Sequence, residues 1–120
     1  MKWKKPSQQL IDAFNRLVPD EEGVEKRKMF SYPCSFINNN MFMGVHQENM
    51  FLRLSEKDRA LFLKLNETRH FEPIVGKFMK EYVVVPQWML EKQKEVQSWI
   101  RKSLKYVSSL PPKIKEKNKK

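Results

Sequence analysis

The sequence predicts a two-layer α+β domain, in which helices pack on one face of an antiparallel β-sheet of about four to six strands. Three observations predict this fold class. Apolar residues recur at helical spacing in two segments, 7–18 and 92–108. Short apolar runs alternate with two asparagine-containing turns between Val24 and Leu54, so consecutive strands must pair antiparallel. The segment 78–85 is rich in the β-branched and aromatic residues typical of sheets.

The first predicted element is a helix over 7–18. Ser7 can cap its N-terminus, and Pro19 ends it. Its inward face is formed by apolar residues at helical spacing, namely Leu10, Phe14, Leu17 and Val18. Gly23 suits a positive φ in the acidic loop that follows. The segment 24–30 can then extend as a strand.

Three further short strands are predicted at 34–37, 41–46 and 50–54. Pro33 lacks a backbone N–H, so we expect the segment 31–33 to interrupt the sheet. The turns at 38–40 and 47–49 contain asparagine, which tolerates left-handed backbone. Because side chains alternate along a strand, one face of 41–46 is expected to carry Met41, Met43 and Val45, and the other Phe42, Gly44 and His46.

The remaining elements are two helices separated by a strand and loops. Ser55 and Asp58 form a capping-box pattern for a helix that runs to about Leu65. Its inward side chains are expected to be Ala60, Leu61, Phe62 and Leu65. We expect a loop or irregular edge at 66–73, a strand at 78–85, and a short turn from Pro86 to Leu90. The last helix, 92–108, has an apolar stripe of Val96, Trp99, Ile100, Leu104 and Val107.

Length and charge indicate one domain with basic ends. The chain of 120 residues predicts a basic N-terminal segment at 1–6, a single domain at 7–112 and a disordered tail at 113–120. Three lysines precede Pro6, and five lysines with one glutamate follow Pro112, so the domain carries only +3 of the formal net charge of +10. The candidate nucleic-acid-binding residues are the tail lysines, Lys113, Lys115, Lys117, Lys119 and Lys120.

The composition favours a cytoplasmic protein. A single cysteine excludes an internal disulfide and suits a reducing compartment. The basic N-terminus is not followed by the apolar run of a signal peptide. No segment approaches the 18 or so apolar residues that a membrane-spanning helix needs, so we expect no membrane contact.

No pattern in the sequence indicates catalysis, a cofactor or a metal. Three glycines cannot form a phosphate-binding G-x-G-x-x-G or Walker A loop. One cysteine and two histidines cannot make a structural zinc site. The best catalytic alternative pairs Cys34 with His46 on neighbouring strands, because a reactive thiolate needs a nearby base. The competing interpretation, a buried thiol and a half-exposed histidine, is favoured because free cysteines are usually buried.

An ordered set of segments resembles the TfoX N-terminal domain family, named for a regulator of bacterial competence also called Sxy. The matching segments are KMF at 28–30, FINNNMFMGVHQ at 36–47, LRLSEKDRA at 52–60, GKFMKEYVVVP at 76–86, W-I-x-x-S-L-x-Y at 99–106 and SLPPK at 109–113. The resemblance implies a two-layer α+β domain similar in shape to bacterial secretion chaperones. It brings no catalytic residues, and it identifies the chain as a stand-alone single-domain member.

The resemblance also suggests what the protein does. Full-length competence regulators are thought to help the cyclic-AMP receptor protein at certain promoters. We therefore expect a non-enzymatic accessory protein that binds another protein, plausibly of the transcription machinery. Weak, non-specific nucleic-acid binding through the lysine-rich ends is the first alternative, and an uncharacterised enzyme that uses Cys34 is the second. Pairing of two copies through the sheet or the last helix is conceivable.

Overall fold

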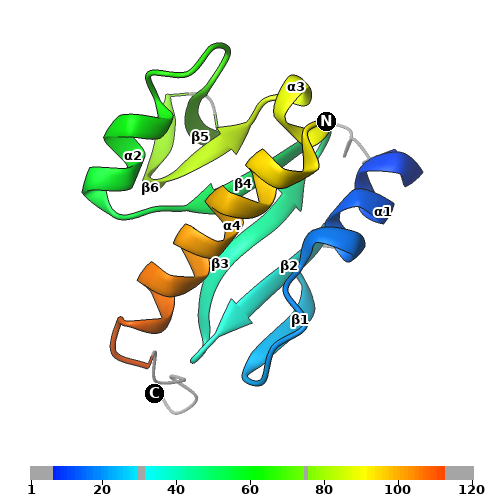
Figure 1. The fold of residues 1–120 in the computed structure, drawn as a ribbon, viewed down its shortest axis with the longest axis vertical. Coiled ribbons are helices and arrows are strands. Elements are labelled where there is room, and N and C mark those ends of the chain that lie inside the picture. The colour runs from blue at the N-terminus through cyan, green and yellow to red at the C-terminus, as the bar shows by residue number, and fades with distance from the viewer. Residues whose placement is uncertain (1–6, 30–31, 75, 113–120) are drawn as a thin grey trace.

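The computed structural model describes residues 7–29, 32–74 and 76–112. Its four helices in chain order are α1 (Gln8–Leu17), α2 (Glu56–Phe62), α3 (Gln87–Leu90) and α4 (Gln93–Ser108). The strands are β1 (Val24–Met29), β2 (Tyr32–Ile37), β3 (Asn40–His46), β4 (Asn49–Arg53), β5 (Arg69–Ile74) and β6 (Lys77–Val85). The predicted fold class is confirmed, because these strands form one antiparallel sheet with helices packed against it (Figure 1).

The sheet has six strands in the order β1-β2-β3-β4-β6-β5. The first four form the expected meander, and β6 inserts between β4 and β5. Two tight turns fix the register of the meander. Asn38 and Asn39 adopt positive φ between the paired residues Ile37 and Asn40, and Gln47 does the same between β3 and β4. Asparagine is enriched in this conformation among residues with a side chain, which explains Asn38 and Asn39 at this turn.

All four helices contribute buried side chains to one core on one face of the sheet. In Figure 1, α4 crosses in front of the central strands, and its contacts with β2, β3 and β4 agree with that view. Ser7 caps α1 as predicted, with its hydroxyl accepting from the Leu10 N–H at 3.1 Å. The predicted stripe of α4 is confirmed, since Val96, Ile100, Leu104 and Val107 are buried.

A β-bulge at Phe42 exchanges the predicted faces of Met41 and Phe42, whereas Met43 and Val45 share one face as predicted. Ser35 pairs with Met43, but the next residue of β2, Phe36, pairs with Met41, so Phe42 is an extra residue in β3. Phe42 therefore joins Met43 and Val45 in the core beneath the helices. Met41 instead packs on the opposite face of the sheet. The strict alternation expected from the sequence fails at the bulge.

One expected interruption of the sheet is part of a strand instead, and the expected irregular edge is an edge strand with shifts in its register. Pro33 lies inside β2 opposite Lys28, and the β2–β3 pairing begins only at Cys34, so no hydrogen bond to β3 needs a Pro33 N–H. The segment expected as a loop or irregular edge contains β5, an edge strand whose pairing with β6 shifts at Phe71. Its bulges and Pro73 obscure the alternation that would have identified it.

The helix α2 is shorter than predicted, and its inward side chains are as predicted at Phe62 and Leu65 but not at Ala60 and Leu61. It ends at Phe62, with Leu63 as its C-cap, and only Phe62 is buried. Ala60 is exposed and Leu61 is 49% exposed, so neither faces inward as expected. The predicted N-cap is confirmed, because the Ser55 hydroxyl accepts from the Asp58 N–H at 3.2 Å.

Candidate functional site

The thiol of Cys34 is a buried structural group. It lies on the face of the sheet opposite the helices, is 3% exposed, and approaches the backbone carbonyl of Tyr32 with the sulfur 3.6 Å from the oxygen. Burial raises the pKa of Cys34 to about 11, against a weaker opposing effect of a backbone hydrogen bond. The thiol is therefore protonated near neutral pH, which is the wrong state for a nucleophile.

His46 packs among aromatic side chains. Cys34 pairs with Gly44, and His46 lies farther along the same strand. The imidazole packs between two aromatic rings, with its centroid 5.1 Å from that of Tyr32 and 5.4 Å from that of Phe71. Burial lowers the pKa of His46. Within residues 7–29, 32–74 and 76–112, no hydrogen bond joins the thiol to this ring, whereas a thiol activated by an adjacent base would make one.

An aromatic cluster closes the face of the sheet that carries no helix. Phe51 stacks on Phe71 with ring centroids 4.3 Å apart, and Tyr82 meets Phe51 edge-on at 5.7 Å. Both phenylalanines are buried. Gly44 allows this packing, since a Cβ at that position would lie 2.7 Å from Phe51 Cζ. These side chains form a second, small core, so this face is not a flat apolar surface.

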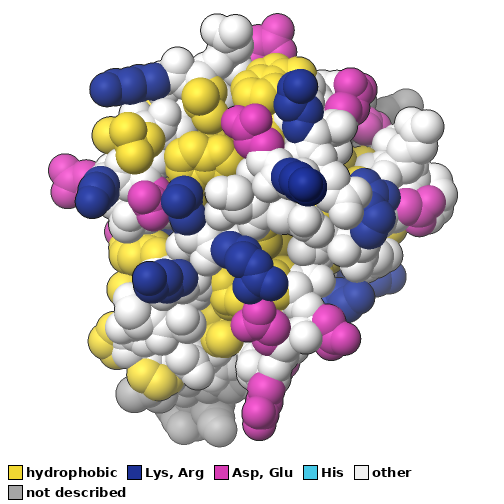
Figure 2. Space-filling view, in the orientation of Figure 1, with side chains coloured by type: hydrophobic (Ala, Val, Ile, Leu, Met, Phe, Trp, Pro, Cys, Tyr) yellow, Lys and Arg dark blue, Asp and Glu magenta, His cyan; other side chains and the backbone are white. Residues whose placement is uncertain are grey.

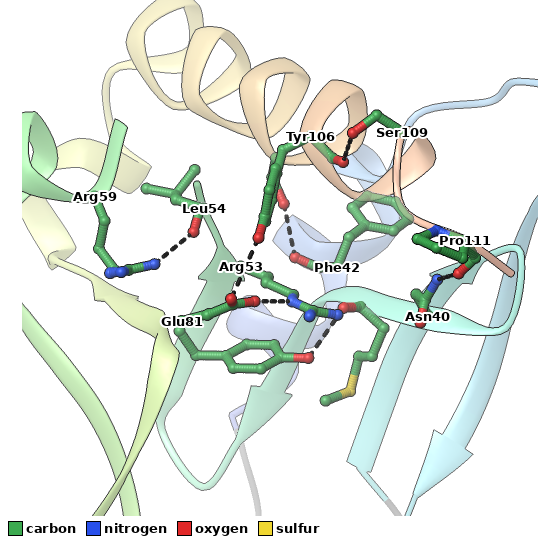
Figure 3. Close-up of polar contacts among 12 residues, drawn as sticks. Asn40, Phe42, Arg53, Leu54, Arg59, Glu81, Tyr106, Ser109 and Pro111 are labelled. Atoms are coloured by element: carbon green, nitrogen blue, oxygen red, sulfur yellow. Dashed lines mark hydrogen bonds and ion pairs between the residues drawn. The ribbon is translucent and has the colours of Figure 1, made fainter. Parts of the chain in front are cut away.

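The most connected polar cluster lies where α4 meets β4 and β6 (Figure 3). Arg53 donates from Nε to Glu81 at 2.7 Å, and the Tyr106 hydroxyl donates to the same carboxylate at 3.3 Å. Burial is the largest single effect on Arg53 and lowers its pKa, but the hydrogen bond to Glu81 and the nearby charges together outweigh burial and raise the pKa. Burial is the main cause that raises the pKa of Tyr106, and the nearby charge of Glu81 is the second. These groups are paired with each other, so the cluster fastens α4 to the sheet.

Two more hydrogen bonds fasten the C-terminal part of the fold. The buried Ser103 hydroxyl donates to the Phe42 carbonyl at 2.9 Å, which satisfies a backbone group at the bulge. Asn40 donates from its side chain to the Pro111 carbonyl at 3.0 Å. Figure 3 shows these contacts along the side of the sheet next to α4. These hydrogen bonds hold the C-terminal part of the fold in place. The candidates for binding a partner are therefore the grooves on the surface.

Two grooves open beside α1. The first has a volume of about 480 Å³ between α1, α3 and the β3–β4 turn, and its charged lining is mostly acidic: Asp12, Glu48 and Glu91, with Arg16. The second, called here the β1 groove, has a volume of about 610 Å³ and lies between α1 and the start of the sheet. It is lined by Ile11, Phe14, Asn15, Lys26, Arg27, Lys28 and Pro33.

The sequence did not indicate the β1 groove. Charged residues at 25–28 weaken the strand pattern of β1, and only their alternation hints that Lys26 and Lys28 share a face. The predicted tail site, Lys113, Lys115, Lys117, Lys119 and Lys120, lies outside the described residues. On the helix-bearing face, Figure 2 shows basic and acidic side chains interleaved, without a broad field of one sign.

Within residues 7–29, 32–74 and 76–112, no three histidine, cysteine or acidic side chains come together as metal ligands could. None of the helices in these ranges is both long and apolar enough to cross a membrane.

Comparison with known proteins gives a single positive result. No curated protein and no solved structure matches the chain. The model of the TfoX N-terminal domain matches residues 16–107, which runs from the last turn of α1 to the last turn of α4 and includes the whole sheet. The match therefore covers most of the chain and all of its central architecture. The chain belongs to the TfoX N-terminal domain family.

Proposed function

We propose that this protein is a non-enzymatic accessory protein of the cytoplasm that acts by binding a protein of the transcription machinery. The observation that carries the proposal is the family match over residues 16–107. The geometry is compatible with it, because the Cys34 thiol is buried and the Arg53–Glu81 pair is internally satisfied. The two grooves beside α1 leave room for a partner on the surface.

The first partner to test is the cyclic-AMP receptor protein, because competence regulators of this family are thought to assist it. Purified chain would be immobilised, and binding of the receptor would be measured by biolayer interferometry with and without cyclic AMP. RNA polymerase would be tested in parallel. A chain lacking residues 113–120 is the matched control, since it loses the tail charge while keeping the folded domain.

The expected result is saturable binding that survives removal of the tail and a moderate increase in salt. Binding that disappears with the tail would mean that charge alone attracts the partner. Absence of binding to either protein, with no specific partner recovered by crosslinking, would contradict the proposal. A reproducible catalytic turnover without any specific partner would contradict it as well.

The lysine-rich tail favours a second candidate function, direct binding of nucleic acid. Five of the last eight residues are lysines. If all of them contact phosphates of duplex DNA, log K should fall with log salt at a slope of about −4 to −5. Replacing the five lysines by glutamine keeps the tail length and should abolish the binding. Unchanged affinity after that replacement, or no binding at low salt, would dismiss the tail as the site.

A further inference from the structure

We propose that the β1 groove docks an extended acidic segment of a partner protein, which pairs with the free edge of β1. The inference rests on the proposed protein-binding function and adds a site and a partner chemistry to it. Three features of the groove carry it: an unpaired strand edge, two uncommitted lysines on one face of that strand, and an apolar floor. In Figure 1, α1 and β1 lie on the same side of the molecule.

The first feature is the edge. β1 is the terminal strand of the sheet, and among residues 7–29, 32–74 and 76–112 it pairs with β2 alone. In an antiparallel pair, alternate residues direct their N–H and C=O groups away from the partner strand. Those groups on β1 can accept another strand, which is how many domains bind extended peptides. At the other end of the sheet, β5 is interrupted by two shifts in its register and offers a poorer template.

The second feature is the charge along β1. Lys26 and Lys28 alternate with Glu25 and Arg27, so the two lysines share the face of Val24, whose side chain packs against the helix-side core. Arg27 is committed to the other face. It donates to Glu25 at 2.6 Å and to Asn39 at 2.9 Å. Within the described ranges, the side chains of Lys26 and Lys28 take part in no ion pair, so their charges remain available to a ligand.

The third feature is the apolar part of the groove. Ile11 on α1 and Pro33 on β2 line it and are half-buried, next to the buried ring of Phe14. A nucleic acid would use the two lysines for phosphate contacts but would gain little from this floor. A peptide strand can use both, because its side chains alternate between faces and can include apolar groups. The lining therefore favours a peptide.

A second copy of the same chain is a poor occupant. Continuing the sheet symmetrically from β1 to β1 pairs residues of the same face. One of the two registers with the greatest overlap places Lys26 opposite Lys28 and Arg27 opposite Arg27. The other places Lys26 opposite Lys26, and its Glu25–Arg27 contacts add little because Arg27 already pairs with Glu25 in its own strand. Like charges directly opposite each other destabilise a strand pair, whereas opposite charges stabilise it. The same two lysines that keep copies apart select a strand with acidic residues at alternate positions.

The geometry defines the probe. A strand antiparallel to β1 meets Lys28 first, then Lys26, then Val24 on the shared face. The probe is a fluorescein-labelled peptide with glutamate, glutamate and valine at successive alternate positions, and threonine between them. Binding would be followed by fluorescence anisotropy. The double variant Lys26→Glu/Lys28→Glu tests the site, and Lys57→Glu/Lys64→Glu on or next to α2 is the control with the same change in net charge.

Wild type and the α2 control are expected to bind the peptide, and Lys26→Glu/Lys28→Glu should lose at least tenfold in affinity. A peptide with lysines in place of the glutamates should bind that variant better than wild type. Equal loss in both double variants would overturn the inference, because net charge alone would then explain binding. Displacement of the peptide at lower concentration by single-stranded DNA than by unlabelled peptide would overturn the peptide assignment.

The test separates this inference from the function on which it rests. If a transcription protein binds wild type and Lys26→Glu/Lys28→Glu equally, protein binding stands and the β1 groove is not the site. If the acidic peptide binds at β1 but no transcription protein binds the chain, the groove stands and the proposed function fails. Amide chemical shifts supply the location, since changes induced by the peptide should centre on β1 and the adjacent face of α1.

Discussion

Replacing Gly44 by alanine is expected to destabilise the fold by about 1 to 3 kcal/mol, the range for forcing an extra carbon into a packed core. The new Cβ would lie 2.7 Å from Phe51 Cζ and 3.3 Å from Cys34 Sγ. Contacts this short require one neighbour to move. Phe51 cannot move freely, because it is 3% exposed and stacked on Phe71. The cost should therefore come from the crowding of the aromatic cluster.

The measurement is urea denaturation followed by circular dichroism, with a double-mutant cycle to isolate the clash. Phe51→Leu removes the ring that the new Cβ would meet, so Gly44→Ala should cost clearly less in that background than in wild type. Gly76→Ala is the matched control. No atom lies within 4 Å of its Cβ position, but its φ is +85°, so its cost should come from the backbone and stay unchanged in the Phe51→Leu background.

Two results would refute the reasoning. A loss of less than about 0.5 kcal/mol in Gly44→Ala would show that the cluster accommodates a methyl group without strain. Additive losses in the cycle, with a coupling energy near zero, would show that the cost of Gly44→Ala has another origin than Phe51. In either case, the close approach of β3 to the Phe51 ring would not explain the glycine at this position.

Three more perturbations test the interior. Ser103→Ala should lower the free energy of unfolding, measured by urea denaturation, by about 1 to 3 kcal/mol, because it leaves the buried Phe42 carbonyl without its hydrogen-bond donor. The control Ser108→Ala, on the exposed side of α4, should change this free energy little. Burial raises the pKa of Cys34 from 9.0 to about 11, so the thiol of the unfolded chain ionises at lower pH than that of the folded chain. The free energy of unfolding of wild type, relative to that of Cys34→Ala, should therefore fall by about 2 kcal/mol between pH 9 and 11. Because burial lowers the pKa of His46, the imidazole of the unfolded chain takes up a proton before that of the folded chain as the pH falls through 6.5. The free energy of unfolding should therefore decrease below that pH in wild type, and it should decrease less in His46→Phe.

The sequence predicted the elements whose signals are local. The cap at Ser7, the asparagine turn and the stripe of α4 each depend on residues close together in the chain, and the structure confirms them. The failures arise where pairing between strands decides the outcome. The bulge at Phe42 depends on its register against β2, and Pro33 is tolerated only because the β2–β3 pairing begins at Cys34.

The candidate site was less predictable than the fold. Sequence reasoning placed binding in the lysine tail, where charge is densest, and it treated the charges of β1 as a weakness of that strand. The β1 groove needs α1 beside the edge of the sheet, a relation between residues 11 and 26 that no periodicity contains. It also needs Arg27 to be paired elsewhere, which only the contacts with Glu25 and Asn39 reveal.

The placement of α4 also matters while the chain is being synthesised. The meander is complete at Arg53, but the core that buries its side chains Met50 and Leu52 also contains side chains of a helix that ends at Ser108. Translation at about 5–20 residues per second would leave this apolar face open for roughly 3 to 10 seconds. During that interval the nascent sheet is a natural client for ribosome-associated chaperones, and closure of the fold awaits its last helix.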